Sequence, residues 1–341
     1  MNLTLYIPGL FGPGARFSED YIPRAESLEF LLGRAQQSPI APASYHASLC
    51  KLFDLETPPE HDVPVAALTR LIDADDYAAG CWMRADPVHL RADRHGLTLL
   101  DARALNLDMR DALALAAELH DLVQGQGWQL EVPHPERWYV RLGSRPALRT
   151  RELDEVVGGN VAGALPAGAD APLWHGLLNE IQMRLHGSEV NRARESRGMV
   201  PVNSLWLWGI GEVPITPAPR WWKVYSDDVG ARAFARFSGI PSAPMALSLR
   251  DLPLDAAGAA PILVVADACK RCVEIQDLQG WNEAVCALEE RWFEPTLQML
   301  RSGDLGRLEL HSGDRRFVIT RASRYFFWRR PAPLAGHLAG S

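Results

Sequence analysis

The chain has 341 residues, of which 47% are hydrophobic and 23% charged, so it can bury a sizeable core arranged as two domains or as one domain with a large insertion. Its net charge of -7 argues against a general nucleic-acid binder, because binding of a phosphate backbone needs a concentrated positive surface. No stretch is long and apolar enough to span a bilayer, and the N-terminus lacks the basic region of a secretory signal. The five cysteines are scattered and do not suggest a disulfide framework. We therefore expect a cytoplasmic protein that engages neither nucleic acid nor membrane.

The first 84 residues alternate between strand and helix patterns. Residues 2–7 are largely apolar and stop at Pro8-Gly9, which predicts a strand that delivers a loop at its carboxyl end. Apolar residues at helical spacing predict helices over 27–36 and 65–72, and a further strand is expected at 81–84. Ligands of open α/β sheets bind beyond the carboxyl ends of the strands, so the loop after the first strand is a candidate site.

The stretch from 85 to 185 has a different pattern, which is typical of a small α+β domain. Its expected elements are a helix at 109–122, strands at 128–132 and 137–142, and a loop rich in glycine, alanine and proline at 158–172. The α/β pattern then returns, with strands at 204–208 and 262–266, helices at 227–237 and 281–300, and final strands at 307–311 and 316–321. We predict an α/β core formed by residues 1–84 and 186–331, an inserted α+β domain at 85–185, and a tail at 332–341.

The segment HGSEVNRARESRGMVPVNSLWLWGIG, from His186 to Gly211, resembles a segment of archaeal-type cofactor-independent phosphoglycerate mutases. In that family an Asn, an Arg, a Gly and a Pro-x-Asn lead into a strand that ends in Gly-x-Gly. The matching positions are Asn191, Arg194, Gly198, Pro201, Asn203, Gly209 and Gly211. A glycine loop of this kind could bring backbone N–H groups close to an anion. The alternative is that the glycines only serve a turn and the tryptophans only pack, since an isolated Gly-x-Gly is a weak signal.

The resemblance implies the fold of the alkaline phosphatase superfamily, a three-layer α/β core with a mostly parallel sheet. SYHASLCKLF, residues 44–53, is similar to the segment that holds the family's phosphorylated serine, with Ser44 as the best match and Ser48 as the alternative. CWMRADPVHL is similar to the stretch that carries a substrate-facing arginine, matched by Arg84. The resemblance thus implies a ligand-binding set of Arg84, Asn191, Arg194, Asn203, Gly209 and Gly211.

The resemblance also indicates that this chain has lost metal ligands of the superfamily. Pro8 stands where the superfamily has a metal-binding Asp, Asp267 follows its strand without a nearby His, and Leu310-His311 stands where an Asp-His pair is expected. Asp267 and His311 remain, too few for a two-metal site. We therefore expect no cofactor and a catalytically degenerate protein, of a bacterial branch described as mutase-like or regulatory, that binds a small phosphorylated molecule.

Two other functions stay open. The first is an active phosphomutase or phosphatase that uses manganese or zinc, with Ser44 or Ser48 phosphorylated in turn. The second is an interaction module in which the arginines and aromatic residues of RRFVITRASRYFFWRRP, residues 315–331, bind an acidic protein partner, although the same pattern suits a last strand that covers the core. Cys269 and Cys272 follow a predicted strand and are interpreted as two free thiols rather than as a redox or zinc pair.

Overall fold

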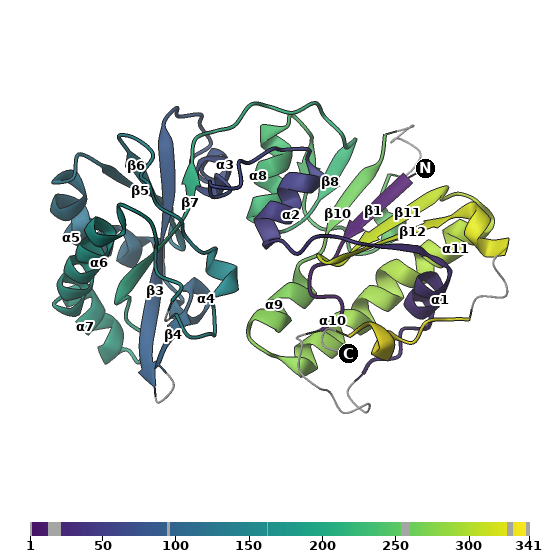
Figure 1. The fold of residues 1–341 in the computed structure, drawn as a ribbon. Coiled ribbons are helices and arrows are strands. Elements are labelled where there is room, and N and C mark those ends of the chain that lie inside the picture. Colours follow the sequence, from purple (N-terminus) through teal and green to yellow (C-terminus); the bar gives the residue numbers. More distant parts are fainter. Residues whose placement is uncertain are drawn as a thin grey trace. The chain divides into compact units, whose positions relative to one another are not determined.

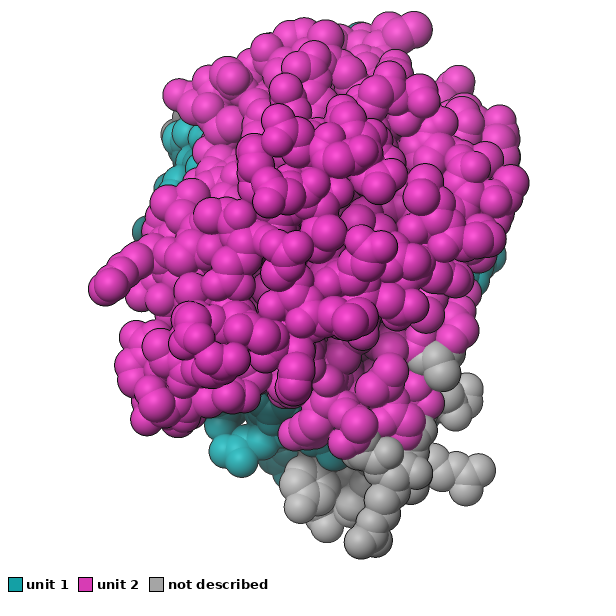
Figure 2. Space-filling view, turned by 90° about the vertical axis from the view of Figure 1, so that its left-hand side faces the viewer, with its two compact units in different colours: residues 1–54, 217–341 teal, residues 55–216 magenta. Residues whose placement is uncertain are grey.

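The structure, a computed structural model, describes residues 2–12, 22–93, 96–161, 163–253, 260–325 and 330–338. The chain forms two compact units. Unit 1 consists of Met1–Asp54 and Pro217–Ser341, and unit 2 consists of Leu55–Thr216 (Figures 1 and 2). None of the helices in the described ranges is long and apolar enough to cross a membrane.

Unit 1 is built on a seven-stranded sheet. Its strands, in spatial order, are β2 (Gln36–Pro39), β12 (Arg315–Thr320), β11 (Arg307–His311), β1 (Asn2–Tyr6), β10 (Ile262–Val265), β8 (Lys223–Tyr225) and β9 (Ser242–Ala243). The central strand β1 is parallel to β10 and β11, and β8 is parallel to both β10 and β9. Only β12 among the paired strands runs antiparallel, against β11 and β2. The predicted mostly parallel sheet is therefore present in this unit.

Helices cover both faces of this sheet. The side chains of β1 show this, because successive ones point to opposite faces and contact different helices. Leu3 and Leu5 are buried in a core formed with α1 (Glu26–Arg34), α10 (Leu278–Leu288) and α11 (Glu294–Ser302). Tyr6 points the other way and stacks on Tyr45, the first residue of α2 (Tyr45–Leu52), with ring centroids 5.9 Å apart. α2 packs beside α8 (Val229–Phe237), and α9 (Ala268–Glu274) follows β10. Unit 1 is thus a three-layer α/β arrangement, as Figure 1 shows.

The long helix predicted near the C-terminus contains a π-helical turn. Residues Glu289–Phe293 form this turn between α10 and α11. Its first residue, Glu289, accepts hydrogen bonds from the backbone N–H groups of Ser27 at 2.6 Å and Leu28 at 3.0 Å. The N-terminus of α1 has no capping side chain of its own. A carboxylate from 261 residues further along the chain therefore satisfies N–H groups that a helix start leaves free.

Unit 2 contains a five-stranded sheet in which all pairings between strands are antiparallel. Its strands are β4 (Gly96–Leu100), β3 (Cys81–Asp93), β6 (Arg137–Leu142) and β5 (Gln129–His134), in that order, with β7 (Ser204–Gly211) paired to β3. One face packs on α5 (Met109–Gln124) and α6 (Ala171–His186). The other carries α3 (Val65–Asp73), while α4 (Ala102–Leu105) and α7 (Glu189–Ser196) complete the unit.

The unit boundaries differ from the predicted ones. The predicted boundary after Arg84 falls inside β3, and the strand at 204–208, predicted for the α/β core, is part of β7 in unit 2. Every residue of β7 is buried, so its apolar run has the same appearance as that of a parallel core strand. Residues 332–338, predicted as a tail, belong to unit 1, where Leu334 is fully buried and its N–H donates to Glu29 Oε1 at 2.8 Å.

Candidate functional site

A pocket lies at the carboxyl ends of β1 and β11 in unit 1. The last residues of these parallel strands, Tyr6 and His311, are register partners, so both strands end at the same edge of the sheet. This is the edge at which open α/β sheets bind their ligands. The pocket has a volume of about 250 Å³ and is lined by Tyr6, Ile40, Ser48, Lys51, Leu52, Arg220, Glu309, His311, Gly313 and Arg316.

Ser48 contributes a hydroxyl that the fold itself does not use. The residue lies on α2 and is only 7% exposed, yet its Oγ has no hydrogen-bond partner in the described part of the chain. Leaving a buried polar group unpaired costs about 1–3 kcal/mol. Because this Oγ is closed off from solvent, the Ser48 side chain has to turn toward the pocket before a ligand atom there can supply the missing hydrogen bond. Ser44 does not line this pocket, because it is the N-cap of α2 and its Oγ accepts from Ala47 N at 3.3 Å.

Cationic side chains line the same pocket as Ser48. The ammonium of Lys51 donates to the carbonyl of Ala41 at 3.3 Å and has no carboxylate partner among the described residues. Arg220 pairs with Asp54 at 3.1 Å, and the Asp54 side chain is 62% exposed. Exposed ion pairs contribute only about 0–1 kcal/mol, so neither cation is tightly committed to the fold.

Glu309 is the one carboxylate among the described residues that line the pocket, and its charge is balanced by its neighbours. His311 Nε2 lies 3.5 Å away, Arg316 Nη2 lies 2.7 Å away, and Arg307 Nη2 lies 2.6 Å away. The hydrogen bond from His311, followed by those from Arg316 and Arg307, holds the pKa of Glu309 well below its usual range. The pocket therefore combines a neutralised carboxylate with two further cations, a balance that favours anions.

The sequence did not mark the cations as pocket residues. Lys51 follows Ser48 by three residues, a spacing that places both on one face of a helix, and it is one of only three lysines in the chain. That signal could have found it. Arg220 and Arg316 come from segments far apart in the sequence, and no local pattern connects them with Ser48.

Asp267, the predicted remnant of a metal site, follows β10 but is not among the pocket-lining residues. Its Oδ2 lies 3.6 Å from Arg271 Nη1, and burial raises the pKa of this carboxyl. Within the described ranges, no three His, Cys, Asp or Glu side chains are grouped so that they could hold a metal ion. The residues present do not fit the two-metal site that the resemblance implies, because such a site needs several carboxylate and imidazole ligands.

The two arginines predicted to bind a ligand lie in unit 2, and both are buried. Arg84 donates through Nε and Nη2 to the two carboxylate oxygens of Asp86, both at 2.8 Å. Arg194 is 0% exposed and donates to Asp111 Oδ2 at 3.1 Å and to the carbonyl of Val200 at 3.0 Å. Their donors are used to hold the unit together. The ligand-binding role of both residues stays a prediction.

The two predicted asparagines also bond to their own chain. Asn191 donates through Nδ2 to the carbonyls of Leu185 and Val202, at 2.8 and 2.7 Å. Asn203 accepts from the N–H of Leu90 at 2.7 Å and donates to its carbonyl at 2.9 Å, which extends the β3–β7 pairing by one side chain. Both amides therefore have a structural use, and their binding role also stays a prediction.

The sequence predicted that Gly209 and Gly211 shape a loop after the strand. In the structure both glycines lie inside β7. Gly209 has a φ of +66°, close to the point where the register of β7 against β3 shifts. A Cβ on Gly211 would lie 2.5 Å from the Cβ of Pro64, the residue before α3. Glycine is needed here so that α3 and β7 can approach each other.

Two cysteines and the arginine and aromatic segment at 315–331 are the remaining candidates named from the sequence. Cys269 and Cys272 are free thiols, and burial raises the pKa of Cys269 to about 12, so this thiol is not a reactive thiolate at neutral pH. In the arginine and aromatic segment, Phe317 is fully buried in the core of unit 1 and Arg316 pairs with Glu309. The residues at 326–329 of that segment lie outside the described residues.

Comparisons with known proteins give one solved structure with a shared fold and two sequence relatives that match short segments. A solved structure from Pyrococcus horikoshii matches 98% of this chain and 92% of its own with a TM-score of 0.56. At 12% identity this likeness shows a shared fold alone. A cofactor-independent phosphoglycerate mutase from Thermoplasma acidophilum aligns at 16% identity over 93% of this chain and 89% of its own, but its TM-score of 0.42 is too low to establish a common fold.

Sequence relatives are matched over short segments. A 2,3-bisphosphoglycerate-independent phosphoglycerate mutase of Methanothrix thermoacetophila is 34% identical over 71 residues, 21% of this chain and 18% of that protein. A second enzyme of that name, from Methanothermobacter thermautotrophicus, is 28% identical over 118 residues, 34% of this chain and 29% of that protein. No protein-family model matches the chain. The matches point to the cofactor-independent phosphoglycerate mutase-like family, although the matched segments span less than a third of either relative.

Proposed function

We propose that this is a catalytically degenerate, phosphoglycerate mutase-like protein that binds a small phosphorylated molecule in the pocket at the carboxyl ends of β1 and β11. The observation that carries the proposal is the buried, unpartnered hydroxyl of Ser48 beside cationic side chains of the same pocket. A phosphate oxygen accepts hydrogen bonds from a hydroxyl, an ammonium and a guanidinium, and the last two bonds are charge-assisted. A phosphate monoester is thus complementary to Lys51 and Arg220, and to Ser48 once its hydroxyl turns toward the pocket.

The pocket volume favours a small ligand. A cavity of about 250 Å³ is slightly smaller than the range of about 300–1,000 Å³ that is usual for drug-sized ligands. It suits a phosphate group with a few additional atoms. Glu309 would add repulsion if its charge were free, but the neighbouring guanidinium groups compensate for it.

Removal of the pocket cations tests this proposal. We expect Lys51→Gln and Arg220→Gln each to weaken binding of 3-phosphoglycerate about tenfold, because a hydrogen bond to a charged group contributes about 1.5 kcal/mol or more. Isothermal titration calorimetry of the full chain with 3-phosphoglycerate, and separately with inorganic phosphate, measures the effect. The matched control is Arg250→Gln, which removes a guanidinium of unit 1 that does not line the pocket. Equal loss in all three variants would contradict a specific site.

The Ser48 hydroxyl also permits the enzymatic alternative, in which it carries a phosphoryl group during turnover. The structure offers no grouped metal ligands in its described part to activate this hydroxyl. Mutase and phosphatase assays with added manganese or zinc distinguish the two functions. Under the proposal, turnover is absent with either metal, and Ser48→Ala weakens ligand binding. Turnover that Ser48→Ala abolishes, or that Ser44→Ala abolishes, would replace the binding function by a catalytic one.

A further inference from the structure

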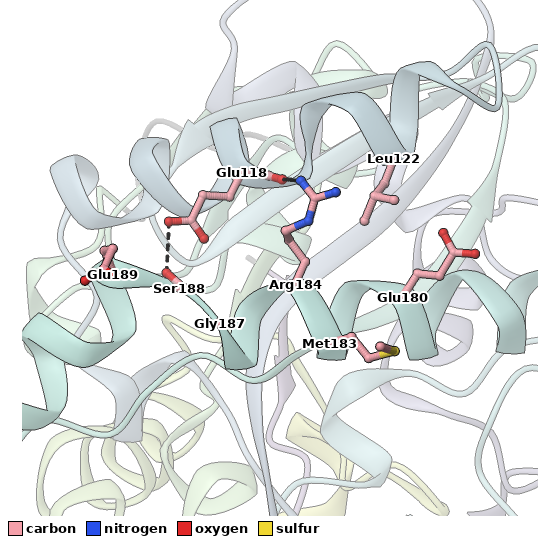
Figure 3. Close-up of a pocket in the computed structure, with 8 residues that line it drawn as sticks. All are labelled: Glu118, Leu122, Glu180, Met183, Arg184, Gly187, Ser188 and Glu189. Atoms are coloured by element: carbon pink, nitrogen blue, oxygen red, sulfur yellow. Dashed lines mark hydrogen bonds between the residues drawn. The ribbon is translucent and has the colours of Figure 1, made fainter.

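A second concave surface lies in unit 2, between α5 and α6. Figure 3 shows Glu118 and Leu122 of α5 facing Arg184 of α6, with Gly187 and Ser188 at the end of the groove. The groove has a volume of about 610 Å³ and is also lined by Glu180, Met183 and Glu189. Both helices are labelled on the left-hand side of Figure 1, the side that faces the viewer in Figure 2. All of the lining residues belong to unit 2, so the groove is a feature of this unit alone.

The helical spacing explains how the groove is formed. Glu180, Met183 and Gly187 follow one another at intervals of three and four residues on α6 and its C-cap, so they lie along one stripe. Gly187 leaves a gap in that stripe, because it has no side chain. Leu122 lies four residues after Glu118 on α5 and borders the same groove from the other side.

The apolar part of the groove is exposed. Met183 is 77% exposed, one of the largest values for an apolar side chain among the described residues. Leu122 is half-buried and packs with its inner side on the core of unit 2. An exposed methionine beside a hydrophobic groove wall is typical of surfaces that bind apolar side chains of a partner.

Carboxylates flank this apolar strip. Glu180 has no partner among the described residues, and Glu118 uses only Oε1, which accepts from Ser188 Oγ at 2.9 Å. Glu189 pairs with the exposed Arg192. Arg184, the one cation among the described residues that line the groove, donates to the backbone carbonyl of Glu118 at 3.0 Å. It therefore does not neutralise the carboxylates of Glu118 and Glu180.

We propose that this groove docks a basic amphipathic helix of a partner protein. An aliphatic side chain of that helix would lie over Leu122 and Met183, and lysine or arginine side chains on its edges would reach the carboxylates of Glu118 and Glu180. The combination of the apolar side chains of Leu122 and Met183 with flanking carboxylates is complementary to a helix with an apolar stripe and basic flanks. An acidic or purely polar segment does not satisfy both parts.

The probe for the test is a synthetic amphipathic helix of about 16 residues with a leucine stripe and lysine flanks, bound to the full chain and followed by fluorescence anisotropy. We expect Glu180→Lys to weaken binding about fivefold or more, because it reverses a charge at the border of the groove. Gly187→Leu should weaken it about tenfold or more by filling the gap. This change is compatible with the fold, since Gly187 has a φ of -82° and a Cβ there meets no atom closer than 3.6 Å.

The controls separate docking from general charge attraction. Glu195→Lys reverses an exposed charge on α7 that does not line the groove, so it should leave the affinity unchanged within about twofold. A peptide in which glutamate replaces lysine should not bind. The NMR signal of the Met183 methyl group should shift when the basic peptide is added. Undiminished binding by Gly187→Leu, an unshifted Met183 methyl, or equal loss with Glu195→Lys would each overturn the proposal.

Discussion

Asp86→Asn is expected to destabilise unit 2 by about 3–5 kcal/mol, because it leaves a buried guanidinium without its counter-charge. Arg84 and Asp86 are 4% and 1% exposed, and Asp86 also accepts from the indole Nε1 of Trp208 at 2.7 Å. Asparagine keeps the size of the side chain but removes the charge and turns one acceptor into a donor that points at other donors. Urea denaturation followed by circular dichroism measures the change in the free energy of unfolding.

Two further variants test whether the loss of stability comes from the ion pair between Arg84 and Asp86. Arg84→Met combined with Asp86→Leu removes both charges, so we expect it to be less destabilising than the sum of the two single changes by about 1 kcal/mol or more. Arg192→Gln removes an exposed ion pair on α7 and should change stability by less than about 1 kcal/mol. A denaturation midpoint of Asp86→Asn equal to that of the unmodified protein would contradict the structural role of Arg84.

Arg194→Met is expected to have a similarly large effect, again about 3–5 kcal/mol. Arg194 connects α7 with Asp111 of α5 and with the carbonyls of Leu105 and Val200, and the change removes all of these hydrogen bonds in a fully buried place. The matched control is Arg197→Gln. Arg197 bonds to the same Asp111 oxygen at 3.1 Å, but its side chain is 50% exposed.

The comparison of these two arginines decides between two roles for Arg194. If the residue is structural, urea denaturation shows a large loss of stability for Arg194→Met and a loss below about 1 kcal/mol for Arg197→Gln. If Arg194 serves a ligand, as the resemblance implied, the variant should keep its stability and lose binding of 3-phosphoglycerate. Equal stability of the two variants would therefore contradict the structural role.

Much of the local structure could be predicted from sequence periodicity. The largely apolar residues of β1 and β10 identified the central strands, and the spacing of Leu28, Leu31 and Leu32 identified α1. The assignment of elements to units failed for β7, because burial on both faces gives the same apolar run in an antiparallel strand as in a parallel one. The π-helical turn was not predicted, and the contact of its first residue, Glu289, with the start of α1 joins segments too far apart for a local pattern to indicate.

Two of the residues that line the unit 1 pocket had been named from the sequence in other roles. Ser48 was the alternative to Ser44, and His311 was a remnant of a metal site. The pocket cations Lys51 and Arg220 were not predicted to act there, because their proximity depends on how α2 and the segment before β8 pack in three dimensions. A motif match selected Arg84 for a ligand, and this role stays a prediction. In the structure its Nε and Nη2 donate to Asp86, two residues later on the same side of the strand, a contact that the motif did not indicate.

Under the proposed function, the unit 1 pocket binds a phosphorylated anion without a metal ion. The most direct test is calorimetric titration of the metal-stripped full chain, kept in EDTA, with 3-phosphoglycerate at low ionic strength. We predict saturable binding at one site with a Kd below about 1 mM, weakened by Lys51→Gln and unchanged by Arg250→Gln. Binding that appears only after manganese or zinc is added, together with mutase turnover, would contradict the claim.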